Sequence, residues 1–163
     1  MKRALLVLTL LSIGIGASGC QYFKERKAIE VYSHDVEKAN KLMAQIAKLD
    51  DQKQLEKKLQ EGIAPFNKYV NDRLIPLWEK YLKAQRDVRT ETPRLRAIHK
   101  LLVDAHERNY TALKELQKDL TLNNLKTKLA EYLRVVNDAR VMAQTYYTKL
   151  EAYYKDHHYT LRK

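Results

Sequence analysis

Cys20 is the only cysteine in the chain, and its thiol is the side chain with the clearest capacity for covalent chemistry. One thiol cannot form an internal disulfide, and an unpaired thiol is unusual in an exported protein. Other nucleophiles are scarce, because Ser33 is the only serine after Cys20 and no glycine elbow surrounds it. The sequence also has no glycine-rich loop that would hold a phosphate. We therefore expect a protein that is not an enzyme.

The first 19 residues have the composition of an export signal. Lys2 and Arg3 follow the initial methionine, and no charged residue occurs between them and Gly19. A positive start followed by a short apolar stretch is typical of a secretory signal sequence. The strongly apolar part ends at Ile15, short of the roughly 20 residues that a membrane-spanning helix needs. We predict a cleaved signal over residues 1–19 and a mature domain over residues 20–163.

Small residues lead directly into the cysteine, in the order Ala17-Ser18-Gly19-Cys20. This segment resembles the lipobox of bacterial lipoproteins. The resemblance implies a diacylglycerol on the Cys20 thiol, cleavage between Gly19 and Cys20, and acylation of the new amino group. The family usually has leucine where this chain has Ala17. An ordinary signal peptide is the alternative, since small residues also precede its cleavage site.

A lipid on Cys20 would hold the domain at a membrane. One acyl chain binds a bilayer only marginally, whereas two or three anchor a protein stably. The residue after the cysteine is Gln21 rather than the aspartate that retains such lipoproteins at an inner membrane. We expect a location in the cell envelope, and in a cell with two membranes on the outer membrane facing the periplasm.

The mature domain is basic. The chain has 31 Lys and Arg and 20 Asp and Glu, and removing Lys2 and Arg3 leaves 29 minus 20, or +9. A net positive surface suits anionic partners such as lipid headgroups, envelope polymers or nucleic acid. Export argues against nucleic acid, so the expected partner is an envelope protein or an anionic envelope polymer. A solvated basic face without a specific ligand is the alternative.

The spacing of apolar residues predicts an all-α fold. Gly62 is the only glycine after Gly19, and no Asn-Gly or Asp-Gly hairpin pair occurs. Apolar residues recur every three or four positions, as in helices that pack like coiled coils. The predicted helical segments are residues 22–49, 55–90, 93–119 and 122–155. Short connections between them favour antiparallel neighbours. We expect one domain, an elongated antiparallel bundle of three to four long helices.

Several residues predict where these helices start and break. Proline removes an amide donor and clashes with the carbonyl four residues earlier, so we expect a break near residues 62–65 and a kink at Pro76. Thr92 should cap the third segment, with Pro93 in its first turn. Thr121 is the corresponding cap candidate for the fourth.

Two histidines of the third segment are the best candidates for metal chemistry. His99 and His106 lie seven residues apart on one helix face. A helical metal site usually spaces its histidines four apart, as in His-Glu-x-x-His, and His106 lacks that partner. We interpret both as surface histidines beside the apolar seam and predict no metal and no cofactor.

Tyrosine is enriched near the end of the chain, where six of the eleven lie between Tyr132 and Tyr159. Tyr146 and Tyr153 occupy the apolar seam. The tyrosines that directly follow them, Tyr147 and Tyr154, should point outward beside Lys149 and Lys155. Exposed aromatic rings together with cations can bind sugars or anionic polymers. The candidate binding surface therefore comprises Tyr147, Lys149, Tyr154 and Lys155. The alternative is that these rings are core residues.

Beyond the lipobox, the mature domain is similar in architecture to bacterial cell-wall-binding lipoproteins, which pair a lipid anchor with a charged helical bundle. The similarity rests on amphipathic segments such as 52–60 and 113–119. It implies a non-enzymatic envelope lipoprotein that binds a protein or an anionic polymer. The alternative is a spacer or self-associating coiled coil in which the seam of the fourth helix pairs between chains. The sequence leaves the oligomeric state open.

Overall fold

The chain is mostly helical in the part that the computed structural model describes, which is residues 14–50 and 52–159. No strand occurs in these residues, and the predicted all-α fold is confirmed. In chain order the elements are α1 (Gly14–Leu49), α2 (Gln52–Glu61), α3 (Ile63–Tyr69), the π-helical segment η1 (Val70–Leu74), α4 (Ile75–Arg86), α5 (Pro93–Gln117) and α6 (Leu125–Asp156).

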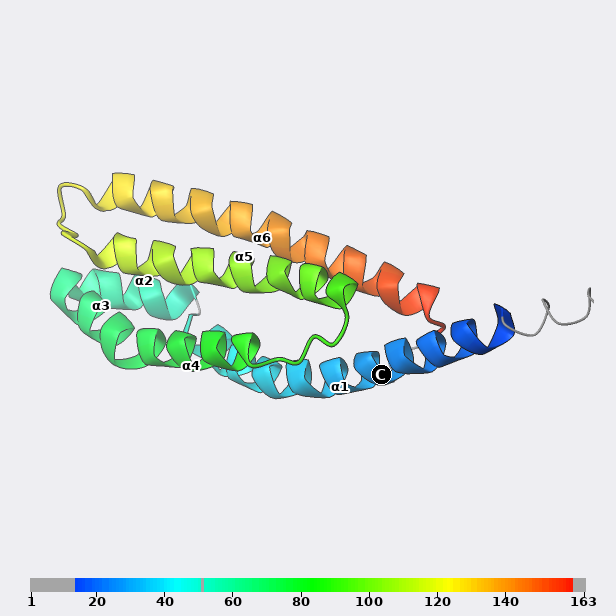
Figure 1. The fold of residues 1–163 in the computed structure, drawn as a ribbon. Coiled ribbons are helices and arrows are strands. Elements are labelled where there is room, and N and C mark those ends of the chain that lie inside the picture. The colour runs from blue at the N-terminus through cyan, green and yellow to red at the C-terminus, as the bar shows by residue number, and fades with distance from the viewer. Residues whose placement is uncertain (1–13, 51, 160–163) are drawn as a thin grey trace, which may run out of the picture.

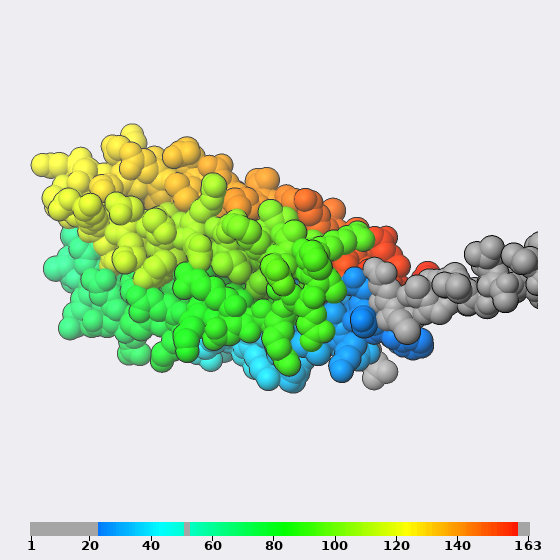
Figure 2. Space-filling view, in the orientation of Figure 1, coloured from blue at the N-terminus to red at the C-terminus, as the bar shows by residue number. Residues whose placement is uncertain are grey.

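The longest helices lie side by side in an elongated body (Figure 1). α6 runs back along α5 after a short turn, α4 packs against α5, and α1 packs against α4. In the space-filling view, α5 and α6 form one long side of the body, and α4 and α1 form the other (Figure 2).

α1 is longer than its apolar seam predicts. Ile29, Tyr32, Ala39 and Ile46, which are spaced by three or seven residues within the predicted segment 22–49, are all buried. The helix begins at Gly14 rather than near Tyr22, so it contains Cys20. The start of the predicted signal, residues 1–13, lies outside the described residues. The backbone therefore passes from the predicted lipid attachment site into the core without a linker.

The predicted break near Gly62 is present. Gly62 separates α2 from α3 and has φ of +124°, a conformation that side-chain-bearing residues rarely adopt. The interruption expected near Pro76 takes the form of η1, which precedes this proline. A wider π-helical turn changes the local hydrogen-bonding pattern where proline would otherwise clash with the preceding turn.

α5 begins as predicted. The Thr92 hydroxyl accepts a hydrogen bond from the amide of Leu95 at 3.2 Å, and Pro93 occupies the first turn. The predicted cap of α6 is wrong: Thr121 lies in the preceding turn, and the helix starts after Asn124, which makes no side-chain cap. Leu122, where the fourth helical segment was predicted to begin, is instead 77% exposed and lies in the turn before α6.

The apolar core consists of two clusters along the body. One surrounds α3, η1 and α4 and includes Phe66, Leu74 and Trp78. The other joins the N-terminal part of α1, the start of α5 and the end of α6, and includes Tyr32 and Tyr146. Buried polar side chains of α4 and α5 connect the two clusters.

Candidate functional site

The C-terminal half of α6 carries the four residues of the predicted binding surface. Tyr147 is 61% exposed, and its ring lies edge-on to Tyr146 with 4.9 Å between centroids. Lys149 and Lys155 are also exposed. Lys155 forms an ion pair with Glu151 at 2.8 Å, one turn earlier on the same helix. These three side chains are accessible to a partner.

The expectation that Tyr154 points outward is wrong. Its side chain is only 4% exposed, and its hydroxyl lies 3.0 Å from the Ser33 hydroxyl of α1. Burial raises the pKa of Tyr154, so the ring stays neutral. Tyr147 occupies the same register one heptad earlier, but α1 does not cover it. Tyr154 is therefore a core residue that joins α1 to α6.

The accessible residues do not form one stripe. Successive residues of an α-helix are about 100° apart, so Tyr147 and Lys149 are separated by about 200°. Lys149 lines a groove of about 340 Å³ on the α5 side, together with Arg94, Ala97, Ile98 and Ala152. The surface predicted as one patch is therefore divided between two sides of α6.

Arg94 is a cation of this region that the sequence analysis did not single out. Its guanidinium donates to Asp156 at 2.6 Å and lies 5.2 Å from the centroid of the Tyr153 ring. Arg94 lies two residues after the predicted cap Thr92, so the sequence predicted only that it is in the first turn of a helix. The contact with α6 depends on the antiparallel register of the two helices, which spacing within α5 does not reveal.

Tyr153 is the centre of a polar junction between three helices. Its hydroxyl donates to the Glu25 carboxylate of α1 and lies 3.1 Å from the Thr92 hydroxyl at the start of α5. Burial and the nearby Glu25 carboxylate raise the pKa of Tyr153 to about 12. This junction fixes the end of α6 against the part of α1 that follows Cys20.

The two histidines of α5 are buried, so their interpretation as surface residues is wrong. His99 is 6% exposed and His106 is 8% exposed. His99 Nε2 lies 2.8 Å from the carbonyl oxygen of Gln85, and its Nδ1 lies 3.0 Å from the Tyr32 hydroxyl. A carbonyl only accepts, so a neutral His99 donates through Nε2 and accepts from Tyr32.

His106 has an analogous arrangement one heptad later. Its Nδ1 lies 2.6 Å from the Tyr81 hydroxyl, which accepts from Gln85 Nε2 at 2.9 Å. Which of the two atoms donates depends on the tautomer of His106, because a tyrosine hydroxyl that accepts from Gln85 can either donate to Nδ1 or accept a second hydrogen bond from it. Burial lowers the pKa of His106 to about 4, with a smaller contribution from His99, and burial also lowers the pKa of His99.

This Tyr–His network crosses the body between α1, α4, α5 and α6. It continues from Tyr32 to the Tyr146 hydroxyl at 2.9 Å. Gln85 Oε1 and Trp78 Nε1 are buried without a hydrogen-bond partner among the described residues. Both histidines are held neutral and each has a tyrosine on Nδ1, so the network positions helices rather than presenting a reactive group.

Within residues 14–50 and 52–159, no group of three or more His, Cys, Asp or Glu side chains is placed to hold a metal ion. Among the same residues, no helix has both the length and the apolar character of a membrane span. Cys20 lies in α1, but its side chain is outside the part that the structure describes.

A second groove lies farther along α5 and α6. It has a volume of about 650 Å³ and an apolar floor that includes Ala112, Leu116 and Val135. Its charged lining residues are Asp104, Glu107, Arg108, Glu115, Lys128, Glu131, Arg134 and Asp138. Five of these residues are carboxylates and three are cations, and two of the carboxylates, Asp104 and Glu107, form ion pairs with Lys100 and Arg86 from outside the groove.

Comparison with known proteins returned no match to a protein-family model, to a curated protein or to a solved structure. The functional argument therefore rests on the residues and contacts of this chain.

Proposed function

We propose that the protein is a non-enzymatic, lipid-anchored protein of the bacterial cell envelope. The single observation that carries the proposal is the sequence around Cys20, a positive and apolar leader ending in Ala17-Ser18-Gly19-Cys20. A lipid on Cys20 gives the only thiol of the chain a role. The signal comprises residues 1–19, and the anchored domain comprises residues 20–163.

The continuity of α1 supports a short attachment. Cys20 and the first buried residues, Ala28 and Ile29, belong to the same helix. At 1.5 Å per residue, the distance along the helix from Cys20 to Ala28 is about 12 Å. A lipid at Cys20 would hold the core close to the membrane. We further propose that the helices form an elongated antiparallel bundle with coiled-coil-like packing.

The anchored domain binds an envelope protein or an anionic envelope polymer through accessible side chains of α6. Tyr147 and Lys155 supply an exposed ring and a cation on one side of the helix, and Lys149 with Arg94 supplies two cations on the other. Aromatic rings and cations together suit sugars and anionic groups. Tyr154 is no longer part of this surface because it is buried.

Metabolic labelling with a fatty-acid analogue tests the anchor. The wild-type chain should incorporate the label, and a Cys20→Ser variant should lose it and accumulate as precursor or soluble protein. Ser18→Ala provides a matched control, since it keeps a small residue before the cysteine and should be labelled normally. Label retained on the serine variant would show that Cys20 is not the attachment site.

Binding to polymer is tested separately by co-sedimentation with isolated envelope polymer. Tyr147→Ala and Lys155→Gln should weaken binding without unfolding the protein, because exposed substitutions usually change stability by less than about 0.5 kcal/mol. Lys83→Gln on α4 removes an exposed cation on another helix and serves as the control. Equal losses from all three variants would indicate unspecific attraction to a basic protein.

A further inference from the structure

The first turns of α1 after Cys20 carry an exposed aromatic ring among cations. The Phe23 side chain is 72% exposed. A single exposed apolar residue is ordinary on a protein surface, but here Lys24, Arg26 and Lys27 surround it and are exposed as well. We call Phe23, Lys24, Arg26 and Lys27 the basic patch of α1.

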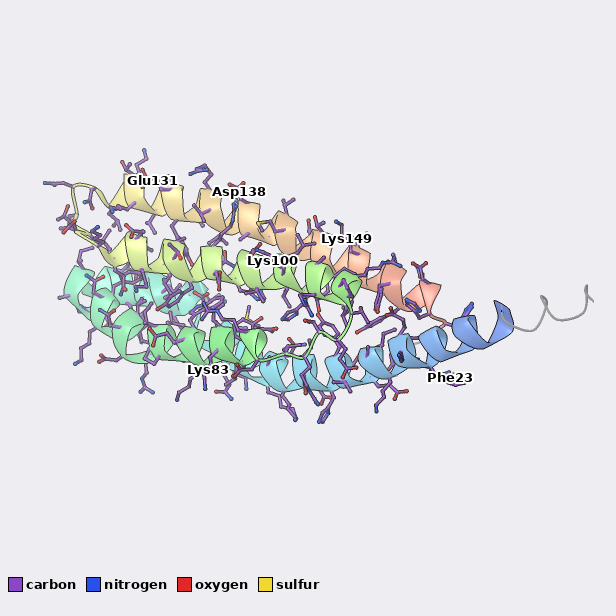
Figure 3. The ribbon with its side chains drawn as sticks, viewed as in Figure 1. Phe23, Lys83, Lys100, Glu131, Asp138 and Lys149 are labelled. Carbon is purple, nitrogen blue, oxygen red and sulfur yellow. The ribbon has the colours of Figure 1, made fainter. Side chains whose placement is uncertain are left out.

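The basic patch lies on the side of α1 that faces away from the core. Residues three or four positions apart share one face of a helix, and Phe23 precedes Arg26 by three and Lys27 by four. Ala28 and Ile29 occupy the opposite face and are buried. Figure 3 shows Phe23 near the start of α1, on the side away from α5 and α6. The patch is therefore open to a partner outside the chain.

The charge of this segment is unbalanced, unlike that of the rest of the helix. Residues 20–29 contain three cations and one carboxylate, 3 minus 1 or +2, and the carboxylate, Glu25, accepts a hydrogen bond from the Tyr153 hydroxyl. Residues 30–41 contain two cations and three carboxylates, 2 minus 3 or −1. In that part Lys41 pairs with Glu37 at 3.8 Å. The excess of cations is confined to the turns that follow Cys20.

The cations of the basic patch form no ion pair with another described residue. Cations of the neighbouring helices at this end of the body do have such partners. Arg94 is paired with Asp156 at 2.6 Å, and Lys155 with Glu151 at 2.8 Å. The positive charge that an external anion would meet here therefore comes from α1.

From this arrangement we propose that the basic patch docks on an anionic bilayer surface, with its cations against lipid phosphates and the Phe23 ring at the headgroup level. The proposal rests on the lipid anchor proposed above. Position 20 precedes Phe23 by three residues, Lys24 by four and Lys27 by seven, so it shares their face of α1. A lipid attached there would turn this face toward the membrane. Helices that lie at membrane surfaces combine aromatic residues with lysine and arginine in this way.

The reach of the charges fits this docking. The distance along the helix from position 20 is about 6 Å to Lys24 and about 10 Å to Lys27. Attraction between charges extends about 10 Å at 0.1 M salt. Each lysine or arginine near an anionic surface favours binding about fivefold. An anchored chain would therefore gather anionic lipids around Phe23, and added salt would disperse them.

Fluorescence quenching of a tryptophan at position 23 tests the docking. The full chain with Phe23→Trp, purified from bacterial membranes, is reconstituted into vesicles of phosphatidylcholine with phosphatidylglycerol as the minor lipid. Bromine on the acyl chains of one lipid at a time quenches the indole while the lipid composition stays constant. Trp78, the other tryptophan, is 3% exposed, and the wild type gives its baseline. Brominated phosphatidylglycerol should quench position 23 well beyond its share of the lipid.

Two double variants in this background test the role of the cations. Lys24→Gln with Lys27→Gln should lower the preference for phosphatidylglycerol at least about fivefold, because two cations are lost. Lys80→Gln with Lys83→Gln removes two exposed lysines at the same spacing from α4, away from the patch, and should leave the preference unchanged (Figure 3). High salt should act like the α1 variant.

Quenching by the two lipids in proportion to their abundance, or by neither, overturns the docking, even if the basic patch binds an anionic polymer. A preference that survives the α1 variant, or that falls equally in the α4 variant, overturns it as well. Fatty-acid labelling reports the anchor independently. Labelled protein with proportionate quenching refutes the docking and keeps the anchor, whereas unlabelled protein with the preference refutes the anchor and keeps the docking.

Discussion

Replacing His106 with asparagine should change how the stability of the protein depends on pH. His106 is buried against Tyr81 and Trp78 of α4, and the histidine of the preceding heptad, His99, adds to the cost of charging it. Burial lowers the pKa of His106 to about 4, whereas the ordinary value is 6.5. The folded protein therefore keeps this ring neutral under conditions in which the unfolded chain protonates it.

The sign of the effect follows from proton binding. Above pH 6.5 neither state binds the proton, and the stabilisation from the neutral ring is fully present. Between pH 6.5 and 4 the unfolded chain binds a proton that the folded chain does not, so the free energy of unfolding falls as the pH falls. A pKa of about 4 in place of 6.5 corresponds to a loss of about 3 kcal/mol.

Asp50 changes the free energy of unfolding with pH in the direction opposite to His106. Burial raises its pKa to about 6 from an ordinary value of 3.8, so the folded chain binds a proton there that the unfolded chain lacks. Its contribution to stability rises as the pH falls between about 6 and 3.8 and offsets part of the loss from His106. The wild-type profile alone therefore cannot isolate the histidine, and the comparison with a variant is required.

Urea unfolding at pH 7.5, 5.5 and 4.5 measures the difference in the free energy of unfolding between the wild type and the His106→Asn variant. His106→Asn keeps a polar side-chain atom near the position of Nδ1 that can hydrogen-bond to Tyr81, but it does not titrate. At pH 7.5 the variant should be less stable because it leaves a cavity, and the gap should narrow by most of about 3 kcal/mol at pH 4.5. His34→Asn on the exposed face of α1 is the control. Parallel profiles, or a His106 ring that titrates near pH 6.5 by NMR, would refute the reasoning.

Substitutions at four positions test the packing, the cap at Thr92 and the backbone at Gly62, each by chemical unfolding at neutral pH. Tyr154→Phe should cost about 1 kcal/mol because it leaves the Ser33 hydroxyl without its partner, while Tyr147→Ala should change stability by less than about 0.5 kcal/mol; equal effects would contradict their different burial. Thr92→Ala should cost about 1–2 kcal/mol and Thr92→Ser much less, since serine keeps the cap. Gly62→Ala should cost about 1–3 kcal/mol because of its positive φ, and an unchanged stability would show that the backbone can rearrange there.

Helix periodicity predicted the parts of the fold that depend on local sequence. The seams of α1 and α5 and the cap at Thr92 follow from residue spacing and from one hydroxyl next to Pro93. The predicted first residues of the helices were less accurate. α1 extends past its apolar seam to Gly14, and α6 starts only at Leu125. A helix can continue beyond its apolar stripe whenever no residue stops it, and spacing alone carries no information about that.

The Tyr–His network was missed for a different reason. His99 and His106 lie at the edge of an apolar stripe, where a polar ring is usually solvated. Their burial depends on hydroxyls supplied by other helices, Tyr32 from α1 and Tyr81 from α4. Two histidines beside one apolar stripe, and two tyrosines within the apolar stripes of other helices, were a signal of such pairing. Which of them meet is decided by helix register, which the sequence analysis did not fix.

The tyrosines of α6 also show that one helix's sequence does not determine which neighbouring helix covers it. Tyr147 and Tyr154 are seven residues apart and share a face of the helix, yet one is 61% exposed and the other 4%. The difference arises because α1 covers only the last part of α6, where Ser33 meets Tyr154. A repeat within one helix predicts a shared face, but a neighbour that crosses only part of the helix divides that face into core and surface.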